Sequence, residues 1–263
     1  MSYGIRPLAT FAALAIFSLA GCGAAMNAPG QDGAVPTDGG APTGDAALAD
    51  GNLPGDAGPS VTTIRIHYPA GTHTLALRGD TAPLDWNMGV TLTADASGVF
   101  SYRFAANPAG PVAYKPVLDD ATWSRGANYT VKPGQIVDVW PHFFATHGTV
   151  EKLFPAFHSN VLDDDRVVWA YLPPSYDENP LATYPVVYMQ DGQNLFDPAL
   201  AFGGNEWKVD ETLDGAAEGD GAIRELIVIG PENDANRIYE YTPTTDPTTP
   251  GGGGADLYLR MLV

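Results

Sequence analysis

The serine and histidine side chains of this sequence stop well before its end, and this limits the chemistry it can perform. Ser175 is the last serine, His158 is the last histidine, and Cys22 is the only cysteine. A serine hydroxyl becomes a nucleophile when an imidazole takes its proton and an acidic group orients that imidazole. No G-x-S-x-G motif, which would carry such a serine on a strand-to-helix turn, occurs in the sequence. We therefore expect no catalytic nucleophile or base in this chain.

Metal-ligating side chains are also sparse. A single cysteine excludes an internal disulfide and a cysteine-based zinc site. His142 and His147 lie five residues apart without an evident third ligand, and the run 163–165 of three aspartates is typical of a solvated turn. Asp191 follows an apolar run, where a turn residue is more common than a catalytic acid. The sequence predicts neither a metal nor another cofactor.

The charge balance excludes two classes of partner. The chain has 13 Lys and Arg against 31 Asp and Glu, a formal net charge of −18. Binding to nucleic acid phosphates requires clustered basic side chains, as does docking on anionic lipid through a basic patch. We expect neither mode of binding.

The first 21 residues have the features of a secretory signal peptide. Arg6 precedes an apolar run over 8–20, which is too short to span a bilayer comfortably. The run ends at Leu-Ala-Gly-Cys, which resembles the lipobox of bacterial lipoproteins. In that family the peptide is cleaved before the cysteine, which is then lipidated. The resemblance implies that Cys22 anchors the chain in the bacterial cell envelope, at the outer membrane or facing the periplasm. The alternative is an ordinary signal peptide that contains a cysteine.

Residues 22–60 are predicted to be a disordered tether. They are rich in Gly, Ala, Pro and Asp and contain no Lys, Arg or aromatic residue. Such a segment cannot bury enough apolar surface to offset the entropy of ordering it. The folded part of the chain is therefore expected to begin at residue 61.

Residues 61–145 contain short runs separated by turn signals, and the first of them, 62–68, alternates as a half-buried strand does. The runs cover 62–68, 74–78, 90–93, 99–104, 112–118 and 136–140. Short strands at this spacing, with no helix-period stretch between them, favour an antiparallel β-sandwich.

The same segment resembles the immunoglobulin-like starch-binding modules that precede many carbohydrate enzymes. The resemblance is carried by LRGD at 77–80, PLDW at 83–86, YKPVL at 114–118 and Trp123. In that family exposed tryptophans stack on sugar rings, which implies that Trp86 and Trp123 bind a glucan. Two alternatives stay open: both indoles pack in the core or at its rim, or the segment is only a spacer or a lid.

Residues 148–263 show a different pattern, in which strands alternate with helices. Strands are expected over 148–153, 166–172, 184–189 and 225–230, and helices over 206–217 and from 256 onward. The runs at 184–189 and 225–230 are almost entirely apolar, as in strands buried on both faces. This alternation predicts a mostly parallel α/β sheet.

This segment resembles the esterase D and enterochelin-esterase-like branch of the α/β hydrolases. Ordered blocks carry the resemblance: VWAYLPPSY at 168–176, YMQDGQNLFD at 188–197, EW at 206–207 with DETL at 210–213, NDANR at 233–237 with YEYTP at 239–243, and GGGGADLY at 251–258. The resemblance implies hydrolysis of a carboxylic ester by a Ser-Asp-His triad. It also implies a strand order 1-2-4-3-5 in the complete sheet.

The resemblance assigns roles to several residues after the third strand. Gly192 and Gln193 are oxyanion-hole candidates, because a tetrahedral intermediate needs two N–H donors at that position. Asn194, Trp207, Arg237 and Tyr241 are candidates for substrate binding, for example of a carbohydrate ester. Arg237 and Tyr241 have an equal alternative, which is to brace the loop.

The family places its nucleophile after a fifth strand, beyond the last residue here. We therefore expect the chain to be the N-terminal part of a lipid-anchored, secreted esterase, inactive as it stands. A second hypothesis is a lipid-anchored carbohydrate-binding protein with a relic hydrolase segment.

Overall fold

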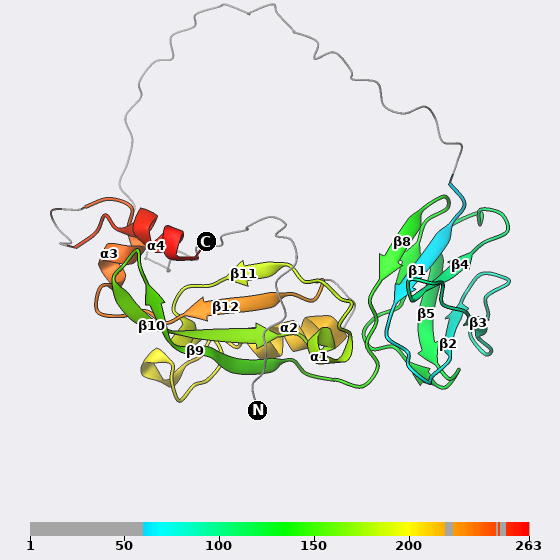
Figure 1. The fold of residues 1–263 in the computed structure, drawn as a ribbon, viewed down its shortest axis with the longest axis horizontal. Helices are drawn as coiled ribbons and strands as arrows, with labels where there is room; N and C mark the ends of the chain where they lie inside the picture. Colours follow the sequence, from blue (N-terminus) through cyan, green and yellow to red (C-terminus); the bar gives the residue numbers. More distant parts are fainter. Residues whose placement is uncertain (1–59, 219–222, 246, 248–250, 263) are drawn as a thin grey trace, which may run out of the picture. The chain divides into compact units, whose positions relative to one another are not determined.

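Eight strands of residues 60–145 form two sheets in the computed structural model, which describes residues 60–218, 223–245, 247 and 251–262 (Figure 1). One sheet has the order β4-β1-β8, and the other has β3-β2-β5-β6, with β7 paired to β5. The bounds are β1 Thr63–His67, β2 Leu75–Gly79, β3 Val90–Leu92, β4 Val99–Arg103, β5 Val112–Leu118, β6 Thr122–Trp123, β7 Tyr129–Val131 and β8 Ile136–Val139. The predicted runs therefore all coincide with strands.

One core cluster joins side chains of both sheets. Ile64 and Ile66 of β1 are fully buried, as are Leu75 and Leu77 of β2, and all four belong to the same cluster. On β1, Arg65 lies between the two buried isoleucines and is exposed, which is the alternation that the sequence shows.

The prediction of an entirely antiparallel arrangement is wrong for one pair of strands. β1 pairs with β8 in parallel, with Ile64 opposite Val137. A parallel pair needs a long connection between its strands. Here that connection is the whole segment from β2 to β7. The pattern of consecutive runs in the sequence does not predict that β1 pairs with a strand so distant in the chain.

The remaining strands form a four-stranded sheet of order β11-β12-β10-β9 (Figure 1). The strands are β9 Thr149–Ser159, β10 Asp164–Leu172, β11 Val186–Tyr188 and β12 Ile227–Pro231. In chain order this is 1-2-4-3, as the resemblance implied. The helical segments are α1 Ser175–Glu178, η1 Gly192–Asn194, η2 Phe202–Gly204, α2 Val209–Glu218, α3 Arg237–Tyr241 and α4 Ala255–Leu262.

The expectation of a mostly parallel sheet is wrong for the residues described. Only β11 and β12 run parallel; β10 is antiparallel to both β9 and β12. β9 and β10 form a hairpin because only 160–163 separate them, and such short connections join antiparallel strands. Asp164 and Asp165, expected in the turn, instead begin β10.

The apolar run at 184–189 was expected to be buried on both faces, but it is not. β11 has only three residues, all half-buried, and it lies at the edge of the described sheet. β12 is inside the sheet and is the better buried of the two parallel strands.

Short polar contacts connect α1 to the first two sheets within the compact unit that spans residues 60–263. The Glu178 carboxylate accepts hydrogen bonds from the backbone N–H groups of 143–145 and from the Tyr68 hydroxyl. Asn179, which is fully buried, donates to the carbonyls of His67 and Pro141 at 2.9 Å each. These contacts hold the two sheet regions at a defined junction.

None of the helices in the described part of the chain is long and apolar enough to span a bilayer. Cys22, the predicted signal peptide 1–21 and nearly all of the tether 22–60 lie outside the described residues.

Candidate functional site

A buried carboxylate follows the carboxyl end of β11 and organises the loop there. Asp191 has a left-handed backbone conformation, with φ 59° and ψ 49°, and begins the turn η1. Its side chain accepts two hydrogen bonds from the Arg237 guanidinium, at 2.8 and 2.7 Å, and another from the Asn233 amide. The Tyr241 hydroxyl accepts a hydrogen bond from the Asp191 backbone N–H at 3.2 Å.

The pKa of Asp191 reflects two opposed effects. Burial by itself raises the pKa, because it disfavours the charged form. The hydrogen bonds from Arg237 and Asn233 outweigh burial and hold the pKa below its ordinary value. Asp191 therefore stays ionised and acts as a fixed anchor for the loop, as expected for a turn residue rather than a catalytic acid.

The oxyanion-hole candidates lie in η1, directly after Asp191. The N–H groups of Gly192 and Gln193 occupy a first helical turn, where no intrahelical acceptor exists. Among the described residues neither donates a hydrogen bond. The Gln193 side chain points back to the scaffold, because its Oε1 accepts the Asn233 N–H at 3.1 Å. Two backbone N–H groups of this braced turn are therefore left without a partner among the described residues.

Two glycines let this turn lie against the sheet. A Cβ atom on Gly192 would stand 2.0 Å from the Gly230 carbonyl oxygen of β12. A Cβ on Gly230 would stand 2.6 Å from Leu195 and 3.1 Å from the Gly192 Cα. Only glycine permits this approach of backbone to backbone.

Arg237 and Tyr241 both belong to α3 and both contact Asp191. Their contacts favour the bracing interpretation over direct substrate binding. The guanidinium of Arg237 also lies 4.9 Å from the centre of the Tyr241 ring, which adds a cation–π contact within the brace.

A buried ion pair holds α3 in place. Arg166 of β10 is 3% exposed and Glu240 of α3 is 2% exposed, and the guanidinium donates to both carboxylate oxygens. Arg166 also contacts Asp164 at 2.6 Å and Asp234 at 3.5 Å. These carboxylates are close enough to suit a metal ion, but the guanidinium already supplies the positive charge between them.

The other two substrate-binding candidates fall in the segment after η1. Asn194 accepts the Phe202 N–H on its side chain at 2.8 Å and the Trp207 N–H on its carbonyl at 2.7 Å. Asn194 therefore shapes this loop. The Trp207 side chain is 47% exposed and free to contact a ligand.

In the described part of the chain, the side chains of His158, Ser159 and Ser175 do not form a catalytic pair. Ser175 is fully buried, and its Oγ contacts the Tyr184 hydroxyl at 2.7 Å and Glu225 at 2.5 Å. His158 instead contacts Asp165 at 3.1 Å. Ser159 is 2% exposed and accepts the Leu162 N–H. None of these serines is presented to an exposed imidazole.

His142 and His147 contact separate carboxylates. The Nδ1 atom of His147 lies 3.4 Å from Asp214, and that of His142 lies 3.8 Å from Glu225. The two imidazoles therefore do not share a common ligand position.

The two tryptophans named as sugar-binding candidates lie next to each other. The ring centres of Trp86 and Trp123 are 6.2 Å apart and the rings are inclined by 39°. Trp123 is 38% exposed and Trp86 is half-buried. The guanidinium of Arg78 lies 4.9 Å from the Trp123 ring and donates to the Trp86 carbonyl at 3.2 Å.

Three charged side chains that hold α1 and α3 in place were not identified from the sequence. Arg166, Glu240 and Glu178 are ordinary charged residues in their local patterns. A signal was nevertheless present, because Arg166 begins the otherwise apolar run 166–172, and a buried arginine requires a charged partner. The raised pKa of Asp210, in the first turn of α2, was also not predicted from the sequence. Burial is the largest cause, and the nearby negative charges of Glu211 and Glu206 add to it, so that the pKa rises to about 6.

Comparison with known proteins gives one family match. Residues 159–262 match the family model described as "Putative esterase". No curated protein matches the chain.

Among solved structures, the chain is similar to an IroE-like serine hydrolase from Shewanella oneidensis, with 26% identity and a TM-score of 0.34. That match covers 44% of this chain and 35% of the hydrolase. A second match is the enterobactin esterase FES from Shigella flexneri, solved in the presence of enterobactin. Its identity is 12% and its TM-score 0.27, over 76% of this chain and 57% of that one. This chain therefore spans about a third of the first protein and just over half of the second. The family match supports the esterase family for residues 159–262.

Proposed function

We propose that this chain contributes the oxyanion-hole part of a carboxylic-ester hydrolase. The observation that carries the proposal is the turn after β11, where Gly192 and Gln193 offer two free backbone N–H groups next to an anchored Asp191. Parallel strands of α/β sheets bind their ligands at their carboxyl ends, and this turn follows the carboxyl end of β11. Because no described serine is activated, the chain alone is expected to be inactive toward esters.

The proposal is tested in a chimera that restores the missing groups. Residues 159–262 would replace the matching segment of an active esterase of the same family, and hydrolysis of p-nitrophenyl acetate would be followed. In this chimera Gln193→Pro removes one N–H donor and should lower kcat about 10²- to 10³-fold. Gln193→Ala is the matched control, because it removes the same side chain but keeps the donor. Equal kcat values for the two variants would contradict the proposal.

Carbohydrate binding through Trp86 and Trp123 is a second proposed function. It is favoured by the adjacency and partial exposure of the two indoles, since a flat aromatic face offers apolar area to a sugar ring. We expect soluble starch in a native gel to retard the full chain and the Trp86→Ala, Trp123→Ala double variant to migrate as if no starch were present. Met88→Ala, which removes a 73% exposed side chain near Trp86, serves as the control. Unchanged retardation of the double variant would leave the packing interpretation.

Lipid anchoring at the bacterial cell envelope is proposed from the sequence around Cys22. Cys22→Ala should move the expressed protein from the membrane fraction to the soluble fraction, because no other cysteine can take the lipid. The measurement is fractionation of cells followed by sequencing of the mature N-terminus. A mature N-terminus at any position other than residue 22 would contradict this anchor.

A further inference from the structure

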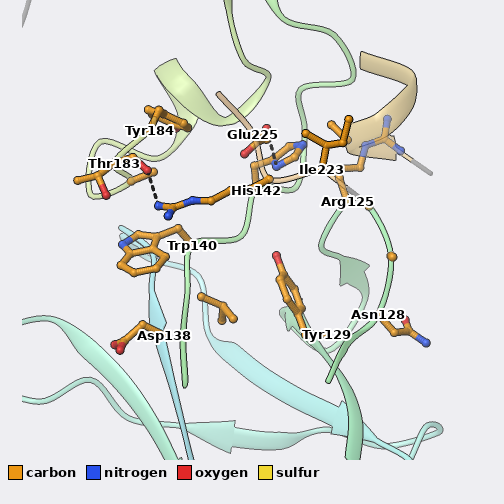
Figure 2. A pocket seen from close by; sticks show the side chains of 16 residues that line it. Arg125, Asn128, Tyr129, Asp138, Trp140, His142, Thr183, Tyr184, Ile223 and Glu225 are labelled. Carbon is orange, nitrogen blue, oxygen red and sulfur yellow. Dashed lines mark hydrogen bonds and ion pairs between the residues drawn. The ribbon is translucent and has the colours of Figure 1, made fainter. Parts of the chain in front are cut away.

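A cleft of about 520 Å³ lies at the other end of the parallel strands from the Asp191 turn. One wall consists of 182–184, which precede β11, and 223–225, which precede β12. The facing wall consists of 125–129 and 138–142 (Figure 2). The volume of the cleft is in the usual range for small-molecule sites. The cleft contains none of the site residues assigned above.

The cleft has buried side-chain nitrogens without hydrogen-bond partners among the described residues. His142 is 7% exposed, and its Nε2 atom has no hydrogen-bond partner among the described residues. The buried Nε of Arg125 also has none, and the nearest carboxylate oxygen, on Glu218, is 3.4 Å away. Arg224 uses one terminal nitrogen to donate to the Thr183 carbonyl at 2.7 Å. Buried polar atoms are rarely left unpaired, so these nitrogens of His142 and Arg125 are available to a ligand.

The two carboxylates of the cleft, in contrast, are already engaged. Glu225 accepts hydrogen bonds from the Ser175 N–H and hydroxyl. Asp138 accepts from Arg65 at 2.6 Å and contacts His67 at 2.7 Å. A ligand that satisfies this cleft must therefore supply acceptors. The arginine guanidinium carries five N–H donors in a fork that matches a carboxylate.

Aromatic rings form the lower part of the cleft. Figure 2 shows Trp140 and Tyr129 on opposite sides of the open space, with His142 above both. The guanidinium of Arg224 lies 5.9 Å from the centre of the Trp140 ring. The His67 ring stacks on Trp140 at 4.8 Å, and Tyr129 stacks on Tyr114 at 5.7 Å. These stacking contacts hold both aromatic side chains in place.

We propose that this cleft binds a small ring compound that carries a carboxylate, with Arg224 and His142 facing the carboxylate and Trp140 and Tyr129 facing the ring. Two sources share this chemistry, namely a uronic sugar and an aromatic acid. The site bridges residues before β11 and β12 and the loops around β7 and β8, so that the ligand contacts both sheet regions. The inference goes beyond the proposed ester hydrolysis and does not depend on it.

Calorimetric titration of the full chain distinguishes the two sources. The uronic sugar is galacturonate, and its neutral counterpart is galactose. The aromatic acid is 4-hydroxybenzoate, and its neutral counterpart is 4-hydroxybenzamide. We expect saturable binding of one carboxylate and at least about tenfold weaker binding of its neutral counterpart. The absence of saturable binding of both acids up to about 20 mM, or equal affinity for an acid and its counterpart, would overturn the proposal.

Variants of Arg224 test the assigned contact. Arg224 is exposed, so its replacement should preserve the fold, which thermal unfolding of each variant would verify. Arg224→Leu should weaken binding of the carboxylate at least about tenfold, and Arg224→Lys should give an intermediate affinity, because it keeps the charge but loses the fork. Arg103→Leu, which removes an exposed arginine of β4, is the control and should bind as the native chain does. Native affinity in a folded Arg224→Leu variant would overturn the proposal.

Discussion

Replacing Glu240 by leucine is expected to lower the free energy of unfolding by about 3–5 kcal/mol, because it leaves Arg166 buried without its main partner. Arg166 and Glu240 are 3% and 2% exposed, so water cannot replace the lost contact. Denaturant unfolding followed by tryptophan fluorescence measures the change. Glu151→Gln, on the exposed side of β9, is the control and should stay within about 0.5 kcal/mol of the native chain.

A double variant separates a buried charge from a packing defect. Arg166→Met combined with Glu240→Leu removes both charges and should recover part of the lost stability, because an apolar pair of similar volume can replace a buried ion pair. Recovery should be incomplete, since Asp164 and Asp234 also lose their contact with the guanidinium. A single Glu240→Leu variant as stable as the native chain would show that this ion pair does not hold α3.

Replacing Gly192 by alanine is expected to cost about 3 kcal/mol or more, at the upper end of overpacking effects. The new Cβ would stand 2.0 Å from a backbone oxygen of β12, and neither the turn nor the central strand can move aside without losing its contacts. Thermal unfolding measures this loss, and proteolysis near residue 192 would report opening of the turn.

Gly215→Ala is the matched control for this substitution. Gly215 lies in α2, where a Cβ would meet nothing within 4 Å, so alanine should stabilise the chain by up to about 1 kcal/mol through its helix propensity. Opposite signs for the two alanine variants are therefore expected. If Gly192→Ala were as well tolerated as Gly215→Ala, the close contact between the turn and β12 would not exist in solution.

Local patterns determined a large part of the fold. Alternation along β1 predicted that strand, because neighbouring residues show which face of a strand is apolar. The turn signal at 69–71 separated it from the run that forms β2. The resemblance to the esterase branch predicted the order in which β9–β12 are arranged, and the sheet has that order. The turn character of Asp191 was also predicted from its place after an apolar run.

Only the tertiary structure decided how the strands run and which distant groups meet. The parallel pairing of β1 with β8 depends on chain direction after a long connection, and no local pattern records it. Asp191 meets Arg237 and Tyr241 across 46 and 50 residues of sequence, and these contacts favour their role as braces. The polar side chains that line the cleft likewise lie close together only because the fold brings residues 125–142 next to residues 182–184 and 223–225. Local patterning reports the burial of each residue, whereas these contacts depend on the order and direction of whole strands.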